Sequence, residues 1–231
     1  MSPATPRPLR FAVDASSTVS ALLCVPADAR AVFVFAHGAG AGMAHPFMAA
    51  CAAGLAERGV ATLRFQFPFM ERASKRPDAP AVAQAAVRAA VHEAARRVPD
   101  LPLFAGGKSF GGRMSAQAQA QAPLPGVRGL AFIGFPLHAA GKPADARAAP
   151  LYALQLPLLF LQGTRDELAH QDRLQPVVQR LGARATLAWF DDADHAFHVR
   201  ARSGRTDAQV RDMLLDTLAD WLHARAAAAP C

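Results

Sequence analysis

Cysteine, aromatic side chains and long apolar runs are all scarce in this chain of 231 residues. Its three cysteines, Cys24, Cys51 and Cys231, are an odd number and form no Cys-x-x-Cys pair. This pattern argues against a disulfide framework and against a zinc site, and it suits a reducing compartment. The apolar runs are too short to span a membrane, and the first ten residues contain no signal-peptide core. We therefore expect a cytoplasmic protein with no membrane partner.

The low aromatic content and the scattered charge also bear on the partners. Aromatic residues make up 7% of the chain, so we expect a core built mainly from Ala, Val and Leu. The formal net charge is +7, but the basic residues alternate with acidic ones and form no run of five or six. A nucleic-acid binder combines a basic stripe with aromatic stacking platforms. The composition therefore predicts no nucleic-acid partner.

Short strand-like segments alternate with longer helix-like ones along the chain. The expected strands are 10–13, 19–25, 31–36, 61–65, 101–105, 129–133, 158–161 and 185–189. The expected helices are 46–58, 78–97, one after Ser109, one between the last two strands, and a final one capped by Thr206 and Gln209. This order predicts a single α/β domain over 1–231, with a mostly parallel, doubly wound sheet covered by helices on both faces. An extended N-terminus is expected at 1–9 and an Ala-rich tail at 226–231, and the stretch 136–157 is too short for a large cap domain.

The segment Gly107-Lys108-Ser109-Phe110-Gly111 matches the G-x-S-x-G pattern of a nucleophile elbow. An apolar strand precedes it and a helix-compatible stretch follows, which is the context that the pattern requires. Glycine is needed beside the serine because side chains there would collide with the neighbouring strand and helix. We therefore predict that Ser109 is the nucleophile of a serine hydrolase.

An alternative is that Ser109 merely caps a helix in a phosphate-binding loop, because Gly107-Lys108-Ser109 resembles the end of a P-loop. That motif begins with glycine five residues before Gly107, where this chain has Pro102. The phosphate interpretation therefore fails at its first glycine.

A catalytic serine needs a base and an acid that orients the base. In this fold the acid follows a later strand and the histidine follows the last one. Asp166 lies just past the strand 158–161, and His195 lies just past the strand 185–189. All three residues are thus expected at the carboxyl edge of the sheet.

Competitors exist for both roles. Glu167 could replace Asp166, which could itself be only a helix cap. His198 could replace His195, and the nearby Asp191, Asp192 and Asp194 could be turn residues. His92 and His223, both on expected helices, are interpreted as surface or half-buried histidines.

The segment His37-Gly-Ala-Gly40 follows the buried strand 31–36. A His-Gly-x-Gly segment there supplies one backbone N–H of an oxyanion hole, and the residue after the nucleophile supplies the other. We therefore assign the two backbone donors to Ala39 and Phe110, and give His37 a structural role. A dinucleotide loop is the alternative, but Met43 stands where its third glycine would be.

Six strings carry a resemblance that runs in order from about Ala31 to Leu222: HGAG, RFQFPFME, GGKSFGGR, GFPLHAAGKP, LQGTRDE and DADHAFHVRARSGRTDAQV. They resemble successive blocks of a predicted α/β-hydrolase family. That family is similar to dienelactone hydrolases and includes bacterial proteins, a testis-expressed mammalian protein and a domain of a chromatin-complex subunit. The resemblance implies Ser109 as nucleophile, Asp166 as acid and His195 as base. Dienelactone hydrolase itself carries a cysteine nucleophile, so Ser109 departs from it.

The function that we predict is hydrolysis of carboxylic esters or thioesters of small molecules through an acyl-enzyme, with no metal and no organic cofactor. Peptidase and acyltransferase chemistry use the same triad. The alternative from another class is a catalytically silent hydrolase-like domain that serves as a binding module. We expect a shallow, open site, with Phe69 and Met70 as candidate pocket residues and with His138, Lys142 and Arg76 as candidates for its rim.

Overall fold

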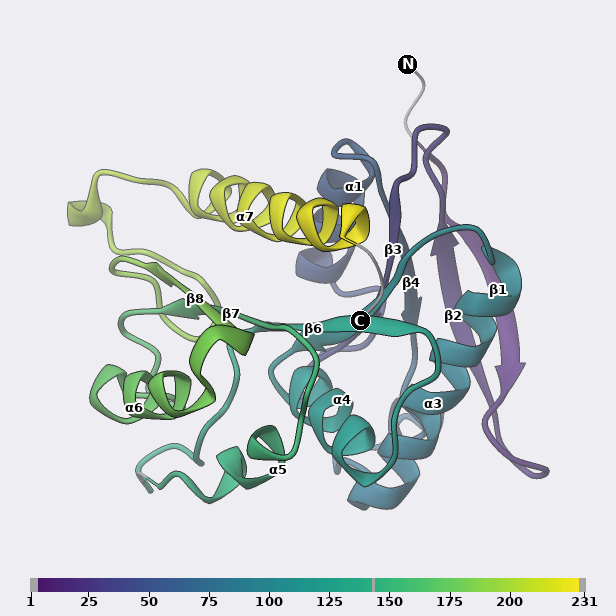
Figure 1. Ribbon diagram of the computed structural model, residues 1–231, viewed down its shortest axis with the longest axis horizontal. Helices are drawn as coiled ribbons and strands as arrows, with labels where there is room; N and C mark the ends of the chain where they lie inside the picture. The colour runs from purple at the N-terminus through teal and green to yellow at the C-terminus, as the bar shows by residue number, and fades with distance from the viewer. Residues whose placement is uncertain (1–3, 143, 229–231) are drawn as a thin grey trace.

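The computed structural model describes residues 4–142 and 144–228. Its centre is one eight-stranded sheet with the order β1-β2-β4-β3-β5-β6-β7-β8 (Figure 1). The strands β1 and β2 pair antiparallel to each other, β2 pairs antiparallel to β4, and the remaining neighbours are parallel. The strand bounds are β1 (Arg7–Ala12), β2 (Thr18–Cys24), β3 (Ala31–Ala36), β4 (Val60–Phe65), β5 (Leu103–Lys108), β6 (Val127–Ile133), β7 (Leu158–Gly163) and β8 (Ala185–Phe190).

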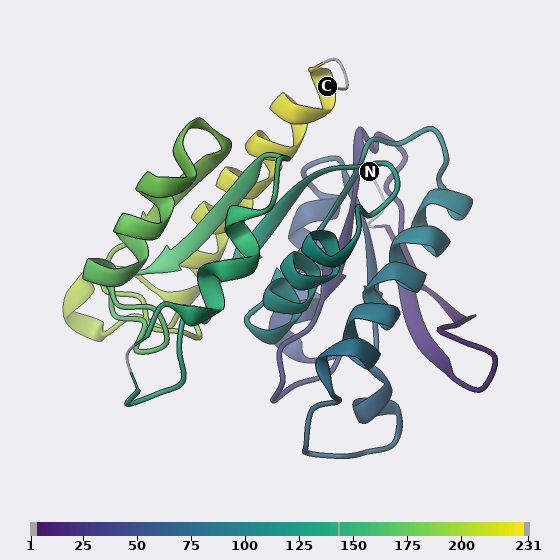
Figure 2. The ribbon, with the colours of Figure 1, turned by 60° about the horizontal axis from the view of Figure 1, so that its bottom comes forward.

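Helices cover both faces of this sheet. The helix bounds are α1 (Pro46–Ala56), α2 (Pro68–Glu71), α3 (Pro80–Arg97), α4 (Phe110–Gln121), α5 (Ala149–Tyr152), α6 (Gln171–Leu181) and α7 (Asp207–Ala227). Helices α1 and α7 pack on one face, and α3, α4, α5 and α6 pack on the other. Figure 2 brings the second face forward, with α3 and α4 lying side by side and α6 on the side of α4 away from α3. The predicted doubly wound α/β fold is therefore confirmed.

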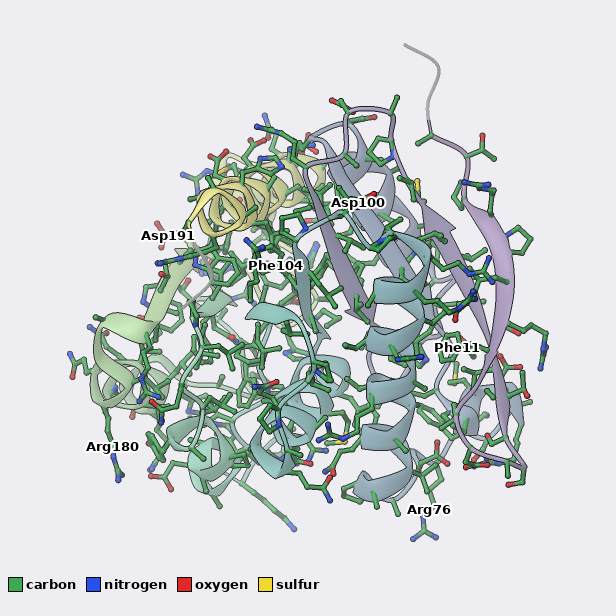
Figure 3. The ribbon with its side chains drawn as sticks, turned by 45° about the vertical axis from the view of Figure 1, so that its right-hand side comes forward. Phe11, Arg76, Asp100, Phe104, Arg180 and Asp191 are labelled. Atoms are coloured by element: carbon green, nitrogen blue, oxygen red, sulfur yellow. The ribbon has the colours of Figure 1, made fainter. Side chains whose placement is uncertain are left out.

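The central strands are buried because both of their pleat faces meet a helical layer. Every residue of β3 and β4 is buried, which explains the unbroken apolar run AVFVFA at β3. The expectation of a core made mainly of Ala, Val and Leu is confirmed, and phenylalanine adds to it. All phenylalanines except Phe47 are buried, so most of the few aromatic side chains lie in the core. Figure 3 shows one of them, Phe104, which lies inside the molecule and packs against Trp221 with ring centroids 5.9 Å apart.

Strand order reverses beside β3, which pairs with β4 on one side and with β5 on the other. In open parallel sheets, ligands bind outside the carboxyl ends of the strands at such a switch point. Here the chain leaves β3 at His37 and leaves β5 at Ser109. The topology therefore brings the two segments singled out in the sequence to one crevice.

Most of the predicted elements are present, with shifted ends. β1 begins at Arg7, so the expected extended stretch at 1–9 is partly strand, and β5 continues to Lys108 rather than ending at 105. The predicted capping box of Thr206 and Gln209 is confirmed at the start of α7. That helix runs to Ala227, so it includes the first residues of the expected tail, while 229–231 lie outside the described residues together with the N-terminal 1–3.

The short helices α2 and α5 were not predicted. Within the described part of the connection from β6 to β7, the helical elements are a single 3₁₀ turn, Ala146–Ala148, and α5. The described residues of this connection therefore form no lid over the carboxyl edge of the sheet. Across the two described ranges, no helix combines the length and the apolar character needed to cross a membrane.

Candidate active site

Ser109 occupies a tight turn between β5 and α4. Its backbone angles, φ 50° and ψ −112°, are ones that residues other than glycine rarely adopt. Glycine makes this turn possible: a Cβ on Gly107 would lie 2.1 Å from the carbonyl oxygen of Ala36, and one on Gly111 would lie 2.5 Å from the same atom. The turn therefore packs directly against the end of β3, and the side chain of Ser109 projects at the start of a helix.

The structure brings Ser109, His195 and Asp166 together, although 86 residues separate the first two in sequence. The Nε2 atom of His195 lies 2.8 Å from the Oγ atom of Ser109, and its Nδ1 atom lies 2.7 Å from Oδ2 of Asp166. Asp166 follows β7 and His195 follows β8, so each side chain comes from the carboxyl end of its own strand. The three groups form one continuous hydrogen-bonded chain.

The carboxylate of Asp166 is 2% exposed and is held at both oxygens. The Gln162 side-chain amide donates to Oδ2 at 2.5 Å, and the backbone N–H of Leu168 donates to Oδ1 at 2.8 Å. Gln162 is itself fixed, because its Oε1 atom accepts a hydrogen bond from the N–H of Phe135. These bonds satisfy the lone pairs of a buried carboxylate and orient it toward His195.

This geometry determines the tautomer of His195. A carboxylate only accepts hydrogen bonds, so the Nδ1 atom of His195 carries the proton that it shares with Asp166. In the neutral ring, Nε2 is then an unprotonated acceptor that faces the hydroxyl of Ser109. The arrangement suits removal of a proton from Ser109.

The competing residues lie elsewhere. His198 pairs with Asp207 at the start of α7, with Nδ1 and Oδ2 2.9 Å apart, and this carboxylate raises the pKa of His198. Glu167 is exposed, and His195 contacts Asp166 instead. His92 is exposed, and His223 is half-buried with its Nδ1 atom 2.9 Å from Arg30.

The three nearby aspartates differ in their surroundings. Asp194 accepts hydrogen bonds from the N–H groups of Ala196 and His198, so it folds the loop that carries His195. Asp192 pairs with Arg200, and Asp191 is exposed.

Lys108, the residue before Ser109, forms a contact that the sequence did not indicate. Its Nζ atom donates to the carbonyl oxygen of His195 at 2.5 Å and lies 5.5 Å from the ring centroid of Phe197. Burial lowers the pKa of Lys108 to about 8, against the opposing effect of the carboxylates of Asp166 and Asp194. Lys108 therefore links the turn that holds Ser109 to the loop that holds His195.

Two backbone N–H groups remain free beside Ser109. Within the described ranges, neither Phe110 nor Ala39 donates its N–H to another protein group. Phe110 opens α4, so its N–H points out of the helix end. The loop of Ala39 lies close by, since a Cβ on Gly38 would lie 3.8 Å from the Cβ of Ser109. The N–H of Phe110 is therefore unpaired next to Ser109, and that of Ala39 is unpaired in the loop that approaches Ser109.

His37 anchors the loop that contains Ala39. Its Nδ1 atom lies 2.7 Å from the carbonyl oxygen of Gly38, and its Nε2 atom accepts the N–H of Phe67 at 3.0 Å. Nε2 can accept only when the ring is neutral. Burial keeps it so, by lowering the pKa of His37 to about 4. This arrangement agrees with the structural role expected for His37.

Two side chains at the end of β4 and just after it fix the other end of the loop at Met43. The Arg64 guanidinium, which is 3% exposed, donates to the Met43 carbonyl at 2.9 Å. Gln66 accepts the Met43 N–H at 2.9 Å. Sequence reasoning missed Arg64, Gln66 and Gln162, although the strings RFQFPFME and LQGTRDE contain them.

The residues expected at the rim and in the pocket differ in their exposure. His138 is 2% exposed and packs edge-on against His170, so it does not line an open rim. Lys142 and Arg76 are exposed, and Figure 3 shows Arg76 pointing away from the body of the molecule. Phe69 is buried and packs against Phe110.

Nowhere in the described ranges do three His, Cys, Asp or Glu side chains gather in a way that could hold a metal ion.

The buried neutral His37 predicts a loss of stability in acid. Its folded pKa of about 4 lies below the ordinary value of 6.5, so the unfolded chain binds more protons between these values. The contribution of His37 to the free energy of unfolding is therefore fully present above about pH 6.5, and it is lost as the pH drops toward 4. Urea unfolding should give a lower free energy of unfolding at pH 4.5 than at pH 7, and His37 should contribute roughly 2–3 kcal/mol to that difference.

In His37→Asn that contribution should vanish, whereas the exposed His92→Asn should unfold with the pH dependence of the parent protein. An unchanged pH dependence in His37→Asn would contradict the neutral, buried state.

Comparison with known proteins agrees with the fold. Three solved structures are similar over nearly their whole length. A dienelactone hydrolase from Anabaena variabilis is 18% identical with a TM-score of 0.73, covering 95% of this chain and 97% of its own. A serine hydrolase without a lid from Xanthomonas campestris is 22% identical with a TM-score of 0.72, covering 99% and 98%. The esterase Est1E from Butyrivibrio proteoclasticus with bound ferulic acid is 15% identical with a TM-score of 0.70, covering 91% and 99%.

At these identities the likeness concerns the fold. The family is shown by a sequence model described as an alpha/beta hydrolase domain, which matches residues 29–223. The matched range extends from the start of β3 nearly to the end of α7, and it includes the turn of Ser109 and the loops of Asp166 and His195. The chain therefore belongs to the α/β-hydrolase family.

Proposed function

We propose that this protein is a serine hydrolase that cleaves carboxylic esters or thioesters through an acyl-enzyme. The observation that carries the proposal is the hydrogen-bonded chain from Ser109 through His195 to Asp166, with distances of 2.8 and 2.7 Å. Three side chains from three strand ends meet in the order and with the tautomer that nucleophilic attack by serine needs. A helix cap that binds phosphate would need neither the histidine nor the buried carboxylate.

In the proposed first half-reaction, Ser109 Oγ attacks the acyl carbonyl carbon while His195 Nε2 takes the hydroxyl proton. The imidazolium that forms keeps its Nδ1–H on Asp166, whose charge stabilises it. The carbonyl oxygen becomes negative as the tetrahedral intermediate forms. The N–H groups of Phe110 and Ala39 are the donors proposed for that oxygen, and their lack of other acceptors makes them available.

The intermediate then collapses. The carbon–oxygen or carbon–sulfur bond to the leaving group breaks, and His195 returns the proton to that group. In the second half-reaction, water gives a proton to His195 Nε2 and attacks the acyl carbon. Collapse releases the carboxylic acid and restores the hydroxyl of Ser109.

A fluorophosphonate probe tests this function directly, because it phosphonylates an activated serine. The probe should label the parent protein and should not label Ser109→Ala. It should also label the control variant Ser203→Ala, which changes a serine in the 3₁₀ turn Ala201–Ser203. His195→Gln should slow labelling at least about 100-fold, since it removes the general base. Far-UV circular dichroism checks that each variant is folded. If the parent protein stays unlabelled while a known hydrolase in the same tube reacts, the chain is a silent hydrolase-like domain and the proposal is wrong.

The contact of Lys108 predicts a separate effect on turnover. Lys108→Met removes the link between the turn and the His195 loop, so kcat for an ester such as p-nitrophenyl butyrate should fall about 10- to 100-fold while KM changes little. Lys108→Arg, which can still donate to the carbonyl of His195, should recover part of the loss, and the exposed Lys75→Met should match the parent. Equal kcat in Lys108→Met and the parent would show that the link does not position the base.

A further inference from the structure

Arg113 lies one helical turn beyond Ser109. Its backbone N–H donates to the carbonyl oxygen of Ser109 at 3.1 Å, so Arg113 lies one turn along α4 from its N-cap, Ser109. Helical side chains lean toward the N-terminus of their helix, which directs Arg113 toward Ser109. The Cζ atom of Arg113 lies 5.5 Å from the ring centroid of Phe110, whose N–H is one proposed oxyanion donor.

A second guanidinium approaches from the connection between β6 and β7. The Nη1 atom of Arg147 donates to the carbonyl oxygens of His138, at 2.9 Å, and Pro136, at 3.4 Å. This connection begins beside the base, since a Cβ on Gly134 would lie 3.4 Å from the ring of His195. Helix α5 starts two residues after Arg147 and packs against α4, which carries Arg113. Arg113 and Arg147 thus stand on adjoining elements at the carboxyl edge of the sheet.

These two cations have no acidic partner. Across the described ranges, neither forms an ion pair, and the side chain of Arg113 makes no hydrogen bond. The Nε atom of Arg113 is buried without an acceptor. Burial, and then the charge of Arg147, lower the pKa of Arg113. The two charges are therefore near enough to repel each other.

Several other arginines are compensated, although the Nη1 atom of Arg184, just before β8, is also buried without an acceptor. Arg58 pairs with Asp216, and Arg200 pairs with Asp192. Arg88 lacks a carboxylate partner but donates to the carbonyl oxygens at the end of α4. Arg113 is a half-buried guanidinium without any acceptor, next to a second cation and beside a nucleophile. An anionic ligand would supply the acceptors that it lacks and balance the two charges.

We propose that Arg113 and Arg147 bind a carboxylate carried by the acyl part of the substrate, so that the enzyme prefers monoesters or monothioesters of short dicarboxylic acids. This inference rests on the function proposed above. Arg113 lies four residues beyond Ser109, the N-cap of α4, which is a rise of about 6 Å along the helix axis. An acyl chain of about four or five carbons would therefore reach from a carbonyl at Ser109 to a carboxylate at the two guanidinium groups.

A pair of isosteric esters tests the preference: the ethyl monoester of glutaric acid and ethyl valerate, which differ by a carboxylate in place of a methyl group. The parent enzyme should show a kcat/KM at least about tenfold higher for the glutarate ester, and added salt should reduce that ratio. Arg113→Gln and Arg147→Gln should each lower the ratio severalfold, chiefly through KM. Arg7→Gln, on the edge strand β1, should leave it unchanged. A ratio near one in the parent enzyme, or a ratio that neither substitution alters, would overturn the proposal.

Binding to Ser109→Ala separates this proposal from the catalytic one. By isothermal titration calorimetry, Ser109→Ala should bind glutarate more tightly than valerate, and the further change Arg113→Gln should abolish the difference. If glutarate binds in this way but the parent enzyme hydrolyses neither ester, the hydrolase function fails and the anion site stands. If ethyl valerate is hydrolysed but glutarate shows no preferential binding, the anion site fails and the hydrolase function stands.

Discussion

The close packing of the turn at Ser109 against the end of β3 is the constraint on which the rest of the site depends. Ala36 leaves no room for a Cβ at Gly107 or at Gly111, so β5 and α4 approach β3 as closely as backbone allows. That approach holds Ser109 at a positive φ and directs its side chain to the carboxyl edge of the sheet. It also sets the free N–H of Phe110 beside the segment that leaves β3.

Side-chain contacts hold the loops around this turn in place. His37, Arg64 and Gln66 hold the loop of Ala39 at its two ends. Gln162 orients Asp166, and Lys108 ties the turn to the carbonyl oxygen of His195. Each of these polar groups lies at the end of a central strand or within a few residues of it. The sheet therefore supplies a rigid frame, and the buried polar contacts set the loops on it.

The sequence predicted the frame well because the physical signals are local. Buried parallel strands are apolar on both faces, as in β3, and the glycines around Ser109 are required by the backbone itself. The residues that follow β7 and β8 could be expected to meet Ser109, since parallel strands end at one edge. The contacts of Lys108 and Arg64 could not be predicted, because their partners lie far away in sequence. Gln162 contacts Asp166 only four residues further on, but that contact depends on the path of the loop after β7. The packing of phenylalanine in the core was missed because composition does not reveal position.

The most direct measurement of the central claim is to trap the acyl-enzyme. Rapid mixing with excess p-nitrophenyl butyrate, acid quenching and peptide mass spectrometry would locate any acyl group. The account predicts a burst of p-nitrophenol that approaches one equivalent, with the butyryl group on the peptide that contains Ser109, on the hydroxyl of that residue. Hydrolysis with no acylated peptide, or with the acyl group on Lys108 or a cysteine, would contradict it.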